Sequence, residues 1–333
     1  MPRISVEAPA KVNLHLHVGE RRSDGFHDIE SLFLALAYGD TLSFETNLEE
    51  PALPSETMPS TEIILDWQLP WGDPKDLSPE KNIVNRAISL FRERTGFDKK
   101  LKIVMEKRIP LGGGLGGGSS DAAATLLALN RLASPGGTGL LSATVLTEMG
   151  ASLGSDIPFF LQTALNDTPT AWVSGRGEHV QPFAAPAQFQ NLSFVLVNPG
   201  IPSDTAKAFR LLDEYRATAP RSPTSIPHSS FLIPHSPHDW PFTNDFMPVF
   251  EAGFKQEKLD GRLFSVCREI ICTLKDLGAE FSGLSGSGST CFGVFANKER
   301  ASTAKETLLL RWNFVIETFC LRSKRFSATI NSK

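Results

Sequence analysis

The glycine-rich run from Gly112 to Gly118 constrains the fold of this chain more than any other feature. Six of its seven residues are glycine, and Leu115 is the exception. Residues without a Cβ cost conformational entropy on folding, but they allow other groups to approach the backbone closely. A strand-like stretch precedes the run and an Ala/Leu-rich helical stretch follows it, so we expect an ordered loop and not a flexible linker.

A polyphosphate suits such a loop, because backbone N–H groups and the positive end of the following helix converge on one point. The hydroxyls of Ser119 and Ser120 would add donors or cap the helix. The chain has no Gly-Lys dipeptide, so the GxxxxGK[ST] loop is missing. Gly112, Gly114 and Gly117 have GxGxxG spacing, but the acidic residue of a dinucleotide fold, expected about 20 positions later, is missing.

Composition narrows the class of protein. With 333 residues, 41% of them hydrophobic and 21% charged, the chain is long enough for two globular lobes. A net charge of −4 argues against nucleic acid as the main partner. The amino terminus resembles no signal peptide, and no apolar run approaches the roughly 20 residues of a membrane helix. We therefore expect a cytoplasmic protein without membrane association; the sequence leaves its oligomeric state open. The cysteines show no metal-type spacing, and we expect free thiols.

Hydrophobic periodicity predicts a β-rich first third and an α+β second half. Strands are predicted at 12–18, 31–37, 41–45, 63–67, 101–105, 194–197, 281–284, 291–296 and 315–321. Helices are predicted at 79–94, from 119 or 120 to 132, and at 142–149, 205–215, 263–277 and 300–311. The Pro-rich segment 218–241 is predicted to be an exposed insertion. Its histidines, His228, His235 and His238, have no acidic or thiol companions, which disfavours a metal site.

Two further segments of small residues can complete a site around the loop. Residues 150–160 set Asp156 between a flexible stretch and an apolar wall. Residues 283–290 form a turn between two strands, and they do not satisfy the GxSxG pattern of serine hydrolases. Without the glycine loop, Lys11 would be interpreted as a solvated charge at a strand edge and Asp156 as a helix cap.

The segment Pro110-Leu111-Gly112-Gly113-Gly114-Leu115-Gly116-Gly117-Gly118-Ser119-Ser120 resembles the phosphate loop of the GHMP kinase superfamily. Residues 8–14, 22–27, 154–158 and 285–288 also resemble this superfamily, and in particular its members that act on a cytidine diphosphate ester of methylerythritol. The resemblance spans most of the chain. It implies a two-lobed α/β (α+β) GHMP kinase fold, with an N-terminal β-rich ATP-binding domain at 1–165 and a C-terminal ferredoxin-like, substrate-side domain at 166–333.

The implied reaction is transfer of the γ-phosphoryl group of ATP to the 2-hydroxyl of the methylerythritol moiety, in non-mevalonate isoprenoid synthesis. Asp156 would accept the hydroxyl proton or orient the hydroxyl, and Lys11 would stabilise the charge that develops on the transferred group. Mg²⁺ is expected because metal ions bridge ATP phosphates, and Ser120 is a candidate ligand.

The resemblance also assigns the binding residues. Phe26 would stack on the cytosine and His27 would hydrogen-bond it; the family commonly has Tyr at the position of Phe26, so one hydroxyl is lost. Asn13 and Thr205 would contact polar groups of the substrate. ATP would contact Pro110, Leu111, Gly112, Gly113, Gly114, Leu115, Gly116, Gly117, Gly118, Ser119 and Ser120, together with Asn82 and Lys107.

Two alternatives stay open from the sequence. The first is a GHMP-type kinase for homoserine or a mevalonate derivative, which the Asp24–His27 turn disfavours because an acyclic substrate needs no base reader. The second is a non-catalytic nucleotide-binding or RNA-binding module. Intact Lys11 and Asp156, and the lack of a basic surface, weigh against it.

Overall fold

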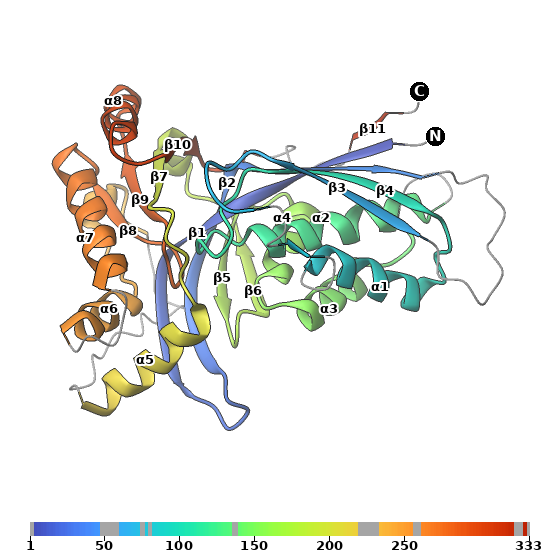
Figure 1. Cartoon of the computed structure of the whole chain (residues 1–333), viewed down its shortest axis with the longest axis horizontal. Helices are drawn as coiled ribbons and strands as arrows, with labels where there is room; N and C mark the ends of the chain where they lie inside the picture. Colours follow the sequence, from blue (N-terminus) through green and yellow to red (C-terminus); the bar gives the residue numbers. More distant parts are fainter. Residues whose placement is uncertain are drawn as a thin grey trace.

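The computed structural model describes residues 3–46, 60–73, 77–78, 82–134, 139–218, 233–255, 261–322 and 329–331. Two sheets with their own helices lie side by side, and the long strands β1 and β2 run from the first half into the second (Figure 1). The strands are β1 (Arg3–Arg21), β2 (His27–Glu45), β3 (Thr61–Trp67), β4 (Leu101–Lys107), β5 (Thr170–Ser174), β6 (His179–Phe183), β7 (Ser193–Asn198), β8 (Phe281–Leu284), β9 (Cys291–Phe295), β10 (Phe314–Phe319) and β11 (Thr329–Asn331). The helices are α1 (Ile83–Thr95), α2 (Gly117–Leu132), α3 (Ala143–Leu153), α4 (Ile157–Asn166), α5 (Thr205–Thr218), α6 (Phe246–Lys255), α7 (Gly261–Asp276) and α8 (Lys298–Leu309).

The first sheet is mainly antiparallel and has the strand order β11-β1-β2-β4-β3, with β5 and β6 continuing from β2. The strand predicted at 101–105 is confirmed as β4, in which Leu101, Ile103 and Met105 are buried and Lys102 is exposed. The two strands predicted at 31–37 and 41–45 are one strand, because β2 keeps pairing with β1 across the interval after a register shift between Pro9 and Lys11.

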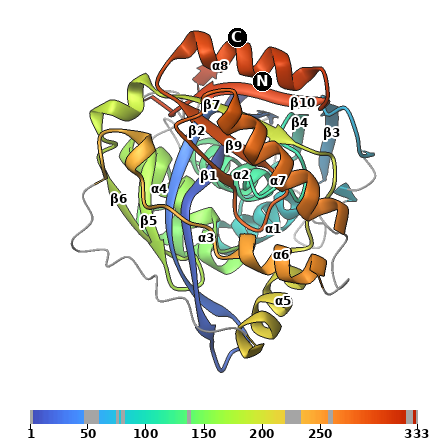
Figure 2. The same ribbon diagram turned by 90° about the vertical axis from the view of Figure 1, so that its left-hand side faces the viewer.

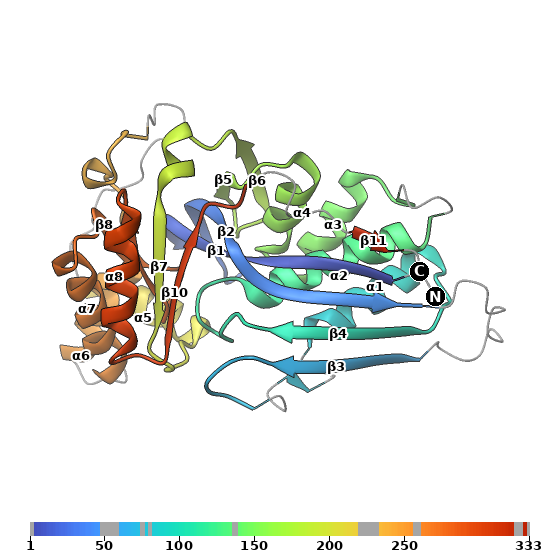
Figure 3. The same cartoon turned by 90° about the horizontal axis from the view of Figure 1, so that it is seen from above.

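Helices α1 to α4 cover one face of this sheet (Figures 1 and 3). Helix α1 begins after Asn82, whose side chain caps it by accepting a hydrogen bond from the N–H of Val84, and it ends at Gly96 with φ of 70°. The core beneath the sheet includes Phe33 and Phe44 of β2 and Phe91 of α1. The helix after the glycine loop, α2, therefore starts against a rigid apolar layer.

The second sheet has the antiparallel order β10-β7-β9-β8. Taken with α5 to α8, its strands follow the βαββαβ order of a ferredoxin-like half, as predicted. Alternate residues of β7 face opposite sides: Val195 and Val197 pack among α7 and α8 residues, whereas Phe194 and Leu196 pack against β1 and β2. Figures 2 and 3 show this sheet between its helices and the first half. The two halves thus share an apolar core.

Five of the helices and strands were not predicted: α4, β5, β6, α6 and β11. Because β5 pairs with β2 and β6 with β5, the first sheet extends beyond residue 165. We therefore propose that the N-terminal half ends after β6, near Phe183, and not at residue 165. Among the described residues, no helix is long and apolar enough to cross a membrane.

Most of the Pro-rich segment, residues 219–232, lies outside the described residues. Its last part is exposed only in places, at His235, His238, Asp239 and Pro241, and so departs from our prediction where Pro237 and Trp240 are buried. Trp240 is buried against Phe189, Phe242 and Phe281, with ring centroids 5.2 to 5.5 Å apart. An aromatic side chain of this size buries a large apolar area, and that outweighs the polar composition around it.

Candidate active site

A cavity of about 690 Å³ lies between the two halves. Its walls come from β1, β2, the glycine loop, the start of α4, the β5–β6 turn, helix α5 and the β8–β9 turn. Six of the predicted site residues meet there with loop glycines Gly114 and Gly116: Lys11, Asn13, Phe26, His27, Asp156 and Thr205. Tertiary structure thus brings together residues that lie far apart in the chain.

Lys11 and Asp156 form the centre of the cavity. The ammonium of Lys11 lies 3.4 Å from Asp156 Oδ2, donates to Asn13 Oδ1 at 2.6 Å, and stands 4.4 Å from the ring centroid of Phe33. Lys11 is only 4% exposed, so it is not a solvated surface charge. Asp156 stands at the N-cap position of α4 but its side chain makes no cap hydrogen bond, so its carboxylate is directed to the lysine and the cavity.

The glycine loop is fixed by the protein itself. Ser285 Oγ donates to the carbonyl of Gly114 at 2.8 Å, and the N–H of Thr290 donates to the carbonyl of Gly113 at 3.1 Å. The N–H of Lys11 donates to Leu115 O at 2.9 Å. The loop is therefore held between β1 and the β8–β9 turn before any ligand binds.

Most of the loop glycines are required by these protein contacts. A Cβ on Gly114 would lie 2.0 Å from Ser285 O, and one on Gly113 would lie 2.8 Å from Asn198 Nδ2. One on Gly117 would lie 2.9 Å from Ile109 Cγ2. At Gly118, in contrast, the nearest such atom is 3.6 Å away. Gly118 is therefore the position where only a ligand would explain the missing side chain.

Lys107 does not reach the cavity. It has no exposed surface; its ammonium donates to Asp121 Oδ2 at 2.6 Å and also to Asp40 Oδ2. Burial opposes its charge, but the two carboxylates outweigh burial and raise the pKa of Lys107. A fully enclosed ammonium cannot contact a nucleotide without breaking this triad, so we replace that expectation with a positioning role for Lys107.

The triad joins the two ends of the glycine loop. Asp40 Oδ1 also accepts from the N–H groups of Arg108 and Ile109, at 2.5 and 2.8 Å, where the loop begins, and Asp121 lies in the first turns of α2, where the loop ends. Burial raises the pKa of Asp121 to about 7, against the opposing charge of Lys107. One proton shared within the triad would leave no net charge buried there.

The other end of the cavity is aromatic. Phe26 is 52% exposed at the tip of the β1–β2 hairpin, with the guanidinium of Arg176 5.1 Å from its ring centroid. His27 is buried, stacks on Phe209 with centroids 5.0 Å apart, and donates from Nε2 to Asp213 Oδ1 at 2.7 Å. Because an ionised carboxylate only accepts, Nδ1 is the ring nitrogen left to bond a base.

Thr205 and Asn13 link the two ends. Thr205 Oγ1 lies 2.9 Å from Ser287 Oγ of the β8–β9 turn. Asn13 Nδ2 donates to Ser31 Oγ at 2.9 Å, so its amide is oriented with the oxygen toward Lys11. Each side chain already has one protein partner that fixes its direction.

The cavity residues that the sequence did not point to include Arg176, Phe209, Arg210 and Asp213. Phe209 and Asp213 had a signal, because they follow Thr205 at intervals of four residues within the predicted helix and so share its face. Arg176 had none, since the β5–β6 hairpin that carries it was not predicted.

Two residues that we expected to contact the nucleotide, Asn82 and Ser120, do not line the cavity. The Asn82 side chain caps α1 and is 4% exposed. The hydroxyl of Ser120 is enclosed and has no hydrogen-bond partner among the described residues. The described residues hold no group of three or more His, Cys, Asp or Glu side chains placed to cage a metal ion. Asp156 is a carboxylate that faces the cavity, and one such group suits a Mg²⁺ ion that is held mainly by nucleotide phosphates.

A ferredoxin-like half, a glycine loop at a helix N-terminus and a Lys–Asp pair in the cleft define a kinase of the GHMP class. Two family models agree: "GHMP kinases N terminal domain" matches residues 82–163 and "GHMP kinases C terminal" matches residues 244–312. Both matches include segments that line or support the cavity.

More specific relatives cover nearly the whole chain. The 4-diphosphocytidyl-2-C-methyl-D-erythritol kinase of Treponema pallidum (strain Nichols) is 34% identical over 94% of this chain and 97% of its own length. The enzyme of that name from Syntrophotalea carbinolica is 35% identical over 91% and 94%. A crystal structure of 4-(cytidine 5'-diphospho)-2C-methyl-D-erythritol kinase superposes with a TM-score of 0.68 at 30% identity, covering 95% of this chain and 99% of that one. The chain belongs to the 4-diphosphocytidyl-2-C-methyl-D-erythritol kinase family.

Proposed function

We propose that this protein transfers the γ-phosphoryl group of ATP to the 2-hydroxyl of 4-diphosphocytidyl-2-C-methyl-D-erythritol, a step of non-mevalonate isoprenoid synthesis. One observation carries the proposal: a single cavity has the Lys11–Asp156 pair in its middle, the glycine loop beside it, and aromatic side chains at its far end. A substrate with a polyol next to a cytidine diphosphate fits that order of groups. Both substrates are charged, water-soluble molecules, so a cytoplasmic enzyme with small-molecule partners stays our expectation.

Asp156 is the group placed to act on the acceptor hydroxyl. Its carboxylate is 28% exposed and faces the cavity, so a hydroxyl can donate to it there and pass on its proton as it attacks. The ammonium of Lys11 can then neutralise charge that develops on the transferred group, in a site where little water screens it. Asn13 and Thr205 would hold the polyol so that one hydroxyl faces Asp156.

The phosphates of ATP belong at the start of α2. Helix α2 begins without a side-chain cap, so its first N–H groups and the helix dipole are available to an anion. Gly118 leaves space for close approach there. Mg²⁺, when bound, would neutralise charge on the phosphates. Asp156 offers it an accessible carboxylate, whereas Ser120 would require the loop to move.

The cytosine belongs at the aromatic end. Phe26 offers an exposed ring face, and His27 offers its second ring nitrogen once Nε2 is bound to Asp213. Base stacking on one exposed ring is worth about 1–3 kcal/mol. The loss of the hydroxyl that a tyrosine would have at position 26 leaves this stacking surface unchanged.

The test is ATP consumption with Mg²⁺, coupled to ADP detection, with 4-diphosphocytidyl-2-C-methyl-D-erythritol as the acceptor and homoserine and mevalonate as controls. We expect turnover with the cytidine substrate alone. Turnover only with a control would keep the kinase class and refute the base site. No ATP consumption with any of the three acceptors would favour the non-catalytic alternative.

Substitution of Asp156 by asparagine separates chemistry from binding. Asp156→Asn keeps the shape of the side chain, and no helix-capping hydrogen bond is lost because the Asp156 side chain makes none. We expect normal folding and ATP binding with kcat lower by about 10²- to 10⁴-fold. Activity like that of the wild type would remove Asp156 from the mechanism.

A further inference from the structure

Helix α5 and the β1–β2 hairpin face each other across the aromatic end of the cavity. The hairpin contributes His27 and Arg21, and α5 contributes Phe209 and Asp213. His27 bonds Asp213 at 2.7 Å and stacks on Phe209, and Arg21 lies 3.8 Å from Asp213. The spacing between these two elements therefore sets the width of the aromatic end.

The hairpin is irregular where it enters this region. The register of β1 against β2 shifts between Val18 and Arg21, and a Cβ on Gly19 would lie 3.0 Å from Asp28 O. A bulged strand leaves backbone groups without a partner in the sheet. Here the carbonyls of Val18 and Gly19 need another donor.

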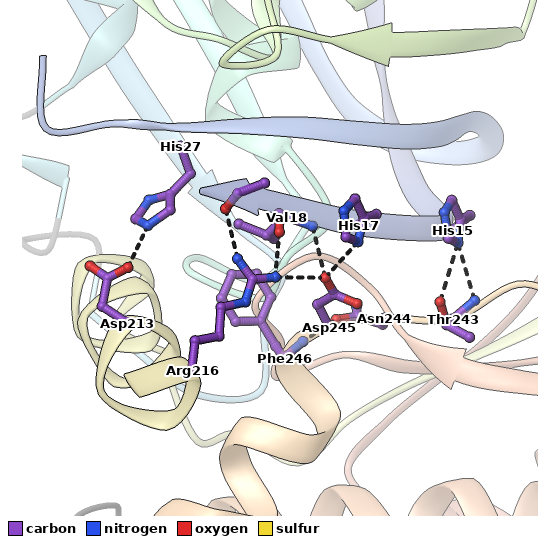
Figure 4. Close-up of polar contacts among 11 residues, drawn as sticks. His15, His17, Val18, His27, Asp213, Arg216, Thr243, Asn244, Asp245 and Phe246 are labelled. Carbon is purple, nitrogen blue, oxygen red and sulfur yellow. Dashed lines mark hydrogen bonds and ion pairs between the residues drawn. The ribbon is translucent and has the colours of Figure 1, made fainter. Parts of the chain in front are cut away.

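Arg216 supplies that donor from α5. Its Nη1 donates to Gly19 O at 2.7 Å and its Nη2 donates to Val18 O (Figure 4). The planar guanidinium can reach both carbonyls at once, which an ammonium on a flexible chain does less well. Arg216 lies about one helical turn beyond Asp213 on the same helix. It therefore holds α5 to the hairpin next to the His27–Asp213 contact.

Asp245, just before α6, holds Arg216 and the strand together. Its Oδ2 accepts from the N–H of Val18 at 2.9 Å and from Arg216 Nη2 at 3.0 Å, and lies 2.9 Å from His17 Nδ1 (Figure 4). Burial alone would raise the pKa of Asp245, but these hydrogen bonds and the nearby charges of His17 and Arg216 outweigh it and lower the pKa. Asp245 is itself fixed, because its N–H donates to Leu16 O at 3.1 Å.

We propose that Arg216, held by Asp245, is a positioning residue for the cytidine end of the substrate. Neither residue lines the cavity, so each acts through the hairpin and α5. The proposal rests on the proposed function, because it assumes that the aromatic end binds the base. It predicts an effect on the cytidine substrate and none on ATP, whose loop lies on the other side of Lys11 and Asp156.

Steady-state kinetics of Arg216→Met and Arg216→Lys test this role. We expect the KM for the cytidine substrate to rise roughly 3- to 30-fold in Arg216→Met, the range seen for residues that act without touching a ligand. The KM for ATP and kcat should stay within about twofold, as should the ATP affinity. If Arg216→Met does not fold, Arg216→Lys decides the question, because it keeps the charge and loses the paired contact to both carbonyls.

Lys207→Met is the matched control. Lys207 is an exposed cation of the same helix; among the described residues its side chain makes no hydrogen bond or ion pair, and only its backbone N–H is bonded, to Asp204 Oδ1 at 2.9 Å. The Lys207→Met variant shows how the loss of one positive charge from α5 affects the KM for the anionic cytidine substrate. We expect its KM values to match those of the wild type. An equal rise in both KM values for Arg216→Met, or an equal effect of Lys207→Met, would overturn the proposal.

Calorimetric titration with cytidine diphosphate separates this proposal from the proposed function. If the wild type does not bind cytidine diphosphate, the base site itself is wrong. If the wild type binds it and both Arg216 variants bind it equally well, the base site stands and the positioning role is refuted. We expect binding by the wild type and by Lys207→Met, with weaker binding by both Arg216 variants.

Discussion

The glycine loop contains one glycine, Gly114, that protein packing requires, and another, Gly118, that only a bound ligand would require. Gly114 has φ of 76°, and a Cβ there would lie 2.0 Å from Ser285 O. Gly118 has ordinary helical space, with the nearest atom 3.6 Å from the position of a Cβ. Replacing each by alanine therefore perturbs either the protein or the ligand site.

The two alanine substitutions should change the free energy of unfolding in opposite directions. Alanine at Gly118 gains helix propensity and restricts the unfolded chain, so it should stabilise the protein by up to about 1 kcal/mol. Alanine at Gly114 costs about 1–2 kcal/mol for the left-handed backbone. Displacement of the Ser285 carbonyl adds roughly 1–3 kcal/mol. Gly118→Ala should thus fold as well as the wild type, and Gly114→Ala should not.

The assay is thermal unfolding combined with kinetics at varied ATP. We expect Gly118→Ala to unfold at or slightly above the wild-type melting temperature. Its KM for ATP should rise about tenfold or more, equivalent to about 1.4 kcal/mol, because the methyl group occupies the space of a phosphate. An unchanged KM for ATP would refute the placement of the phosphates at Gly118. Wild-type stability of Gly114→Ala would refute our packing explanation of the loop.

Three further predictions concern pH and stacking. The pKa of Asp121 is about 7 in the folded state against 3.8 in the unfolded state, so its protonation stabilises the folded state fully below pH 3.8, and this contribution is lost as pH rises to 7. The free energy of unfolding in denaturant should therefore be lower at pH 7.5 than at pH 4.5, and Asp121→Asn should remove this group's share of the decrease. Burial lowers the pKa of His15 from 6.5 to about 4, against the opposing effect of the charge of Asp245. Its contribution to the free energy of unfolding is therefore full above pH 6.5 and falls by about 3 kcal/mol toward pH 4. His15→Gln should reduce this loss of stability between pH 6.5 and pH 4, and an unchanged loss would contradict the prediction. Phe26→Ala should leave unfolding unchanged, because the ring is 52% exposed, and should weaken cytidine diphosphate binding by about 1–3 kcal/mol in calorimetry.

Local patterns in the chain were sufficient for much of the fold. The alternation of β1 and β4, the helix after the glycine loop and the βαββαβ order of the second half all follow from periodicities of two and 3.6 residues, which need no partner to be visible. The glycine loop was predicted from its unusual composition, and the roles of Lys11 and Asp156 were predicted only through the resemblance to the GHMP kinase superfamily.

Other features depend on segments that are far apart in the chain. The short hairpin β5–β6 has a weak pattern of its own, and it forms where the edge of β2 pairs with β5. The sequence predicted that Lys107 contacts the nucleotide, but in the folded protein it is buried and bonded to Asp40, which is 67 residues away in the chain. His27 gained its partner Asp213 from 186 residues away, and Val18 gained Asp245 from 227 residues away. Ion pairs and backbone bonds of this kind have no period, because they depend only on which side chains the folded core brings within about 3 Å.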